Sequence, residues 1–177
     1  MPGESSRVPI WAGATQAVWS LWIIAFVALS VSIVLSSFER WDPAFNSEIP
    51  RSATSADVVL QLRIAAGLSA IGGLLAVSCL VLSLCCIVNR RPRALKAAVV
   101  CGVLAAALPI LVQVVLPWED PYTGQGSPLA TLIGLVILSV FAALSAIPGL
   151  IVTACGIRSA KRAAVTTAQL QRLDRVE

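Results

Sequence analysis

The chain has 177 residues, of which 58% are hydrophobic and 12% are charged, and its mean hydropathy is +0.88. Since a soluble domain carries about 25% charged residues, this composition excludes an ordinary water-soluble globule and indicates a protein whose solvent is a lipid bilayer. The net charge of +4 arises without any histidine, the usual general base and metal ligand near neutral pH, so most acid–base chemistry is disfavoured as well.

Charged residues leave four long apolar intervals between them. A helix needs about 20 mostly apolar residues to cross a hydrocarbon core of about 30 Å. We therefore expect an all-α integral membrane protein, with four transmembrane helices near residues 16–38, 58–88, 96–117 and 128–157. The intervals are too long, and alternate too little, for the strands of a membrane barrel.

Three regions follow from these helices in chain order. We expect residues 1–15 to form a cytoplasmic N-terminal segment, residues 16–157 the four-helix transmembrane domain and residues 158–177 a basic cytoplasmic tail. The first apolar stretch is interpreted as an uncleaved span, because it is longer than a signal-peptide core of 7–15 residues. The tail favours helix, and two interpretations stay open: a helix that lies on the inner leaflet or binds a partner, and a solvated extension of the last span.

Lysine and arginine are distributed unevenly among the ends and loops. Basic residues crowd the turn between the second and third helices and the C-terminal tail, namely Arg90, Arg91, Arg93, Lys96, Arg158, Lys161, Arg162, Arg172 and Arg175. Because cytoplasmic loops retain positive charge, we expect both termini to be cytoplasmic in a multi-pass protein of the cell (inner or plasma) membrane. Trp11, Trp19 and Trp22 are then expected at the inner edge of the first helix. The excess of arginine over lysine is typical of GC-rich coding sequences and points to a bacterial or phage origin.

The second and fourth helices share a repeated segment. Residues 66–79, AGLSAIGGLLAVSC, match residues 142–155, AALSAIPGLIVTAC, at eight of fourteen positions. Chance similarity in an Ala/Leu-rich chain is the competing explanation. We interpret the match as a two-plus-two duplication whose halves share one orientation, so the second and fourth helices are expected to run parallel.

Small residues recur four apart on three of the predicted helices. Small side chains let two helix backbones approach closely, which favours helix association in lipid. Because the motif is common, each instance alone carries little weight. The helix-packing candidates are Ala65, Ser69, Gly73, Ala98, Gly102, Ala106, Ser145 and Gly149.

Polar residues inside the outer half of the spans define a second candidate site. Gln61, Arg63 and Gln113 could line a small vestibule open to the outside, where Arg63 could meet Glu119 or Asp120. The alternative is structural: Arg63 anchors its helix at the interface, and the glutamines form interhelical hydrogen bonds.

No residue set in the chain resembles a catalytic or cofactor site. The predicted spans hold no Asp or Glu, and the five cysteines, Cys79, Cys85, Cys86, Cys101 and Cys155, lie inside helices without a C-x-x-C spacing. We therefore expect no metal, no cofactor, no catalytic residue and no nucleic acid partner. The favoured hypothesis is a non-enzymatic accessory, scaffold or phage-exclusion protein that packs against a membrane-protein partner or its own copies. The alternative is a small channel, transporter or holin-like pore former.

Overall fold

Four long helices make up the described part of the chain, in a computed structural model that describes residues 7–41, 56–116 and 128–173. They are α1 (Ile10–Trp41), α2 (Ala56–Asn89), α3 (Pro92–Val115) and α4 (Pro128–Leu173). All four are long and apolar enough to cross a membrane. The expectation of an all-α chain with four candidate membrane spans is thus confirmed.

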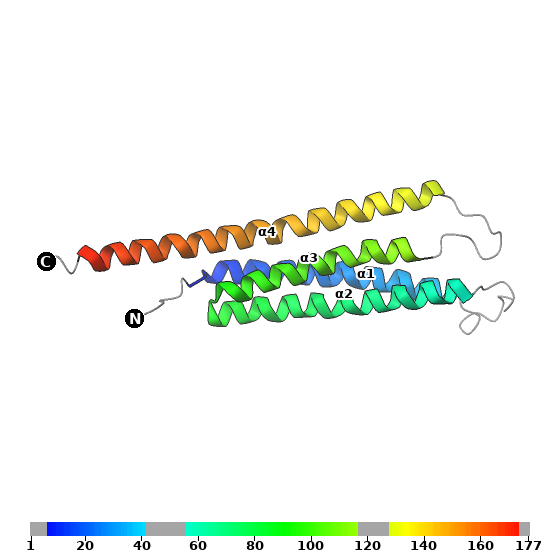
Figure 1. The fold of residues 1–177 in the computed structure, drawn as a ribbon, viewed down its shortest axis with the longest axis horizontal. Helices are drawn as coiled ribbons and strands as arrows, with labels where there is room; N and C mark the ends of the chain where they lie inside the picture. Colours follow the sequence, from blue (N-terminus) through cyan, green and yellow to red (C-terminus); the bar gives the residue numbers. More distant parts are fainter. Residues whose placement is uncertain (1–6, 42–55, 117–127, 174–177) are drawn as a thin grey trace.

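The helices alternate in direction along a common axis (Figure 1). α1 and α3 run one way and α2 and α4 the other, so the start of α1 and the end of α4 lie at the same end of the bundle. We call this end, which carries the turn at Arg90, the Arg90 end, and the opposite end the Trp41 end. α2 packs against α1 and α3, whereas α4 packs against α3 and α1 and does not contact α2 among the described residues.

The turn between α2 and α3 is short because one residue reverses the chain. Arg90 adopts a left-handed backbone with φ 52°, and its N–H donates to the carbonyl of Cys86 at 2.8 Å. This closes α2 in the way that a glycine often does. Pro92 then begins α3, where its missing N–H costs nothing and its fixed φ favours a helix start. The N–H of Val8 donates to the carbonyl of Arg90 at 2.9 Å, which ties the segment before α1 to this turn.

α4 continues without interruption to Leu173, past residue 157 where the predicted span ends. The helical tail expected from the sequence is therefore present as a direct extension of the last helix. Residues 158–173 contain neither glycine nor proline, and their Ala, Arg, Lys, Gln and Leu residues are strong helix formers. α1 likewise begins at Ile10, before the predicted start at residue 16.

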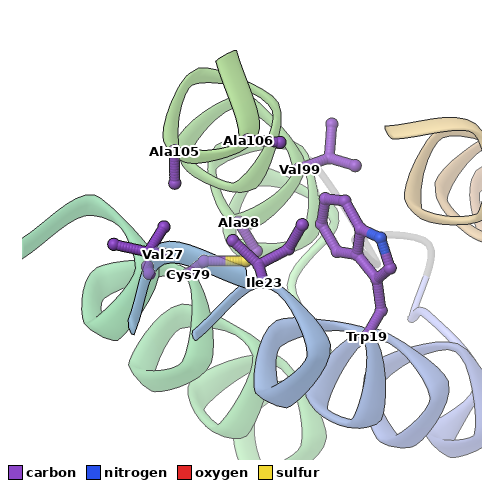
Figure 2. Packing of buried hydrophobic residues seen from close by; sticks show 9 residues of the cluster. Trp19, Ile23, Val27, Cys79, Ala98, Val99, Ala105 and Ala106 are labelled. Carbon is purple, nitrogen blue, oxygen red and sulfur yellow. The ribbon is translucent and has the colours of Figure 1, made fainter. Parts of the chain in front are cut away.

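Buried apolar side chains form three clusters along the bundle axis. The cluster at the Trp41 end contains Val34, Trp41, Leu62, Ala65, Val112 and Leu116. The middle cluster, shown in Figure 2, contains Trp19, Ile23, Val27, Ala76, Cys79, Ala98, Val99, Ala105 and Ala106. The cluster at the Arg90 end contains Val8, Ala12, Cys86 and Leu95. Apolar packing thus recurs from one end of the bundle to the other.

The outer surface of the spans is apolar as well. Leu74 is 71% exposed and Val88 is 80% exposed, and many other large aliphatic side chains face outward. Soluble monomers rarely show apolar patches larger than a few hundred Å². The apolar helices therefore suggest a lipid environment, as expected of a multi-pass membrane protein.

Candidate functional site

The predicted small residues lie mostly inside the helix contacts. The buried ones are Ala65, Ser69, Ala98, Gly102, Ala106, Ser145 and Gly149. Gly73 differs: it is half-buried, and a Cβ atom built on it would meet nothing within 4 Å. The neighbouring Gly72 is the buried glycine of this α2 turn, since a Cβ there would lie 3.5 Å from side-chain atoms of Val27 and Leu108. The packed face of α2 therefore runs from Ala65 and Ser69 to Gly72, and Gly73 lies beside it.

Two of these glycines make room for the indole of Trp19. A Cβ built on Gly149 of α4 would lie 2.6 Å from Cζ2 of Trp19, and one built on Gly102 of α3 would overlap the same ring. Figure 2 shows the ring rising from α1 toward α3, with Val99 beside it. The Trp19 side chain lies inside the bundle, where it is only 6% exposed, and its depth in the membrane stays a prediction. Trp11 and Trp22 remain about half exposed.

The two neighbouring indoles of α1 both bind Ser145 of α4. The Trp19 N–H donates to the backbone carbonyl of Ser145, and the Trp22 N–H donates to its hydroxyl at 2.9 Å. Such bonds are favoured here because a buried indole N–H without a partner pays a desolvation cost. Ser145 is therefore the point at which hydrogen bonds join α4 to α1.

A buried polar cluster joins α1 to α2 closer to the Arg90 end. The hydroxyl of Ser20 lies 3.1 Å from the Cys79 sulfur and 3.2 Å from the Ser83 hydroxyl. Gln16, one turn before Ser20, is fully buried, and neither atom of its side-chain amide has a hydrogen-bond partner among the described residues. This cluster is not among the sites expected from the sequence. Its signal is the four-residue spacing of Gln16 with Ser20 and of Cys79 with Ser83, which places each pair on one helix face.

The residues of the predicted vestibule lie on two helices near the Trp41 end. Gln61 and Arg63 are exposed on α2, and Gln113 is half-buried on α3. The suggested partners of Arg63, Glu119 and Asp120, lie outside the described residues. None of the three lines either of two hollows on the surface of α1.

Two hollows of about 270 Å³ each open on the surface of α1. The first has a mixed polar and apolar surface and lies toward the Trp41 end, where it is lined by Ser32, Ile33, Ser36, Ser37 and Arg40. The second is mostly apolar and lies where α1 meets α4, where it is lined by Trp19, Trp22, Phe141, Leu144, Ser145 and Pro148. We refer to them as the serine hollow and the indole cleft.

The cysteines do not gather into one site. Cys79 and Cys86 are buried, Cys101 is half-buried, and Cys85 and Cys155 are exposed, all five as free thiols. No group of three or more metal-binding side chains comes together within residues 7–41, 56–116 and 128–173. The arrangement of the described residues thus offers close helix contacts and two surface hollows.

Comparison with known protein families, with curated proteins and with solved structures finds no match for this chain.

Proposed function

We propose that this chain is a non-enzymatic multi-pass membrane protein that acts by packing its helices against other membrane proteins, as an accessory, scaffold or phage-exclusion factor. The observation that carries this proposal is that the outer faces of the bundle are apolar like its interior. Apolar clusters recur along the interior of the bundle, while wide apolar faces point outward. A partner helix in lipid binds such a face through close van der Waals packing.

α4 is the helix that we expect to meet the partner. Only 22% of its most apolar window is buried, compared with 39% for α1 and α3. Ile147 and Ile151 of α4 are both about half exposed, and they lie four residues apart on one helix face. A partner seated there would contact a helix that packs on two neighbours, α1 and α3.

Photo-crosslinking in native membranes tests this proposal. Benzoylphenylalanine at position 151 is expected to capture one defined membrane protein, or a second copy of this chain. The control carries the same group at position 74, because Leu74 is 71% exposed on α2, a helix that does not contact α4 among the described residues. Equal capture from both positions, or capture of lipid alone at position 151, would refute the proposal.

The competing function is a small channel or pore former. Reconstituted vesicles distinguish the two: our proposal expects no leakage of ions or small dyes above that of empty vesicles. Leakage that Arg63→Ala abolishes would instead establish the pore, because Arg63 is the charged residue of the predicted vestibule.

We also propose that the Arg90 end faces the cytoplasm. Arg90, Arg91, Arg93 and Lys96 occupy the turn and the start of α3, and Arg158, Lys161 and Arg162 lie on the part of α4 near the same end. Such a concentration of positive charge supports a cytoplasmic location. A bacterial or phage origin remains part of the proposal and rests on composition alone.

The duplication remains a proposal too. Its support is the sequence match, the parallel course of α2 and α4 in Figure 1, and the burial of both Ser69 and Ser145. Other equivalent residues have different surroundings, since Cys79 is buried and Cys155 is exposed. If a duplication occurred, the two copies have since adapted to different neighbours.

A further inference from the structure

The serine hollow and the indole cleft lie on one continuous face of α1. Trp22, Leu29, Ile33, Ser36 and Arg40 follow one another at intervals of seven, four, three and four residues, which places them along one side of a helix with 3.6 residues per turn. Leu29 is 57% exposed and Trp22 is 55% exposed. This face therefore carries serine and arginine side chains among apolar ones toward the Trp41 end, and it is mostly apolar where α1 meets α4.

The length of this face matches one leaflet of a bilayer. Ser36 follows Trp22 by fourteen residues, which corresponds to about 21 Å along a helix that rises 1.5 Å per residue. Half of a bilayer, headgroups included, measures about 20–22 Å. A phospholipid whose phosphate lies beside Ser36 would bring the end of its acyl chain to Trp22.

The serine hollow carries the groups that recognise a phosphate. Arg40 supplies a guanidinium, whose N–H groups pair with phosphate oxygens in charge-assisted hydrogen bonds. The Ser37 hydroxyl donates to the carbonyl of Ile33 at 2.9 Å, and the Ser32 hydroxyl donates to that of Ala28 at 3.1 Å. Ser36 makes no such bond within the described residues, so its hydroxyl is free to donate to a ligand.

We propose that this face binds one phospholipid from the leaflet at the Trp41 end. Its phosphate accepts hydrogen bonds from Arg40 and Ser36, and one acyl chain runs along Ile33 and Leu29 into the indole cleft. Leu144 and Phe141 of α4 form the far wall of that cleft. The lipid would fill the side of α1 next to α4, and its binding does not require the protein partner proposed above.

Native mass spectrometry of the full-length protein with dioleoyl phosphatidylglycerol tests the phosphate end. Arg40→Ala is expected to lower lipid affinity about tenfold, a loss typical of one charge-assisted contact. Arg63→Ala is the matched control, because it removes another exposed arginine near the Trp41 end from a different helix, and it should leave affinity unchanged. Dioleoylglycerol, which lacks the phosphate, should bind no better to the wild type than to Arg40→Ala. Equal lipid affinity of Arg40→Ala and the wild type, or an equal loss in both variants, would overturn the proposal.

A second pair of variants tests the acyl-chain end. Leu144→Ser is expected to weaken binding of the dioleoyl lipid about threefold, because it replaces an apolar wall of the cleft with a hydroxyl. It should not change binding of dihexanoyl phosphatidylglycerol, whose chains are too short to reach the cleft. Leu74→Ser is the control, since Leu74 is an exposed leucine of α2. An unchanged dioleoyl affinity in Leu144→Ser would show that the chain does not occupy the cleft, and inorganic phosphate that competes as well as the lipid would refute a lipid site.

Discussion

Gly149 of α4 faces the indole of Trp19 so closely that a Cβ atom at this position would lie 2.6 Å from Cζ2 of the ring. The same ring occupies the space opposite Gly102 of α3. One α1 side chain thus sets the distance at which two other helices pack. In lipid, where apolar association gains nothing from excluding water, such close fits are a main source of helix affinity.

Gly149→Ala is therefore expected to destabilise the protein, because the added methyl group overlaps the indole. Overpacking of this kind costs about 1–3 kcal/mol. Gly73→Ala is the matched control, since nothing lies within 4 Å of a Cβ at Gly73, and the better helix propensity of alanine should make this variant neutral or slightly stabilising. Thermal unfolding followed by circular dichroism in detergent measures both variants. Equal melting temperatures would show that the contact between α1 and α4 is looser than described.

Trp19→Phe should also lower stability, because it removes the N–H that donates to the carbonyl of Ser145 and leaves space beside Gly102. We expect a loss of about 1–3 kcal/mol. Trp11→Phe changes an exposed indole of the same helix and should have little effect. Both free energies can be measured by unfolding in mixed micelles with increasing sodium dodecyl sulfate. A loss in Trp11→Phe as large as that in Trp19→Phe would contradict the role given to Trp19.

Gln16→Met is expected to stabilise the bundle. The Gln16 amide is buried without a hydrogen-bond partner among the described residues, and an unsatisfied buried polar group costs about 1–3 kcal/mol. Methionine has a similar length and no amide to satisfy. Gln113→Met, at a half-buried position, should change stability by less than about 0.5 kcal/mol. If Gln16→Met melts at a lower temperature than the wild type, the amide has a partner in the membrane, such as a buried water molecule.

The proposed orientation predicts that green fluorescent protein fused after Glu177 will fluoresce in bacterial cells. A single cysteine introduced at Ser47, in a variant whose five native cysteines are replaced by alanine, should react with an impermeant maleimide added outside intact cells. The control is a cysteine at Ser159, on the part of α4 near the Arg90 end, which should react only after the cells are opened. The opposite labelling pattern would show that the Arg90 end faces outward.

The sequence predicts the number of helices correctly, because a long apolar run between charges is a local property of the chain. It does not predict how each helix is rotated about its axis. In water an apolar stripe marks the buried face, but in lipid both faces of a span are apolar, and so the rotation is set by side-chain shape. This explains why the sequence singles out Gly73 as a packing residue when Gly72 is the buried one, and why it does not show that the Trp19 side chain turns into the core. The fit of Trp19 against Gly102 and Gly149 joins residues that are far apart in the sequence, so it cannot be predicted before the helices are placed in space.

α4 is a single helix of 46 residues. At a rise of 1.5 Å per residue it is about 69 Å long, which is more than a bilayer core of about 30 Å requires. The helix stays packed well past Ser145, since a Cβ at Gly156 would lie 2.8 Å from Cβ of Ala12 and Ala160 is only 2% exposed. From residue 161 to residue 169 every side chain is exposed, which corresponds to about 14 Å of helix beyond the last buried residue. This stretch carries Lys161 and Arg162 away from the bundle, where an acidic surface can reach them from all sides.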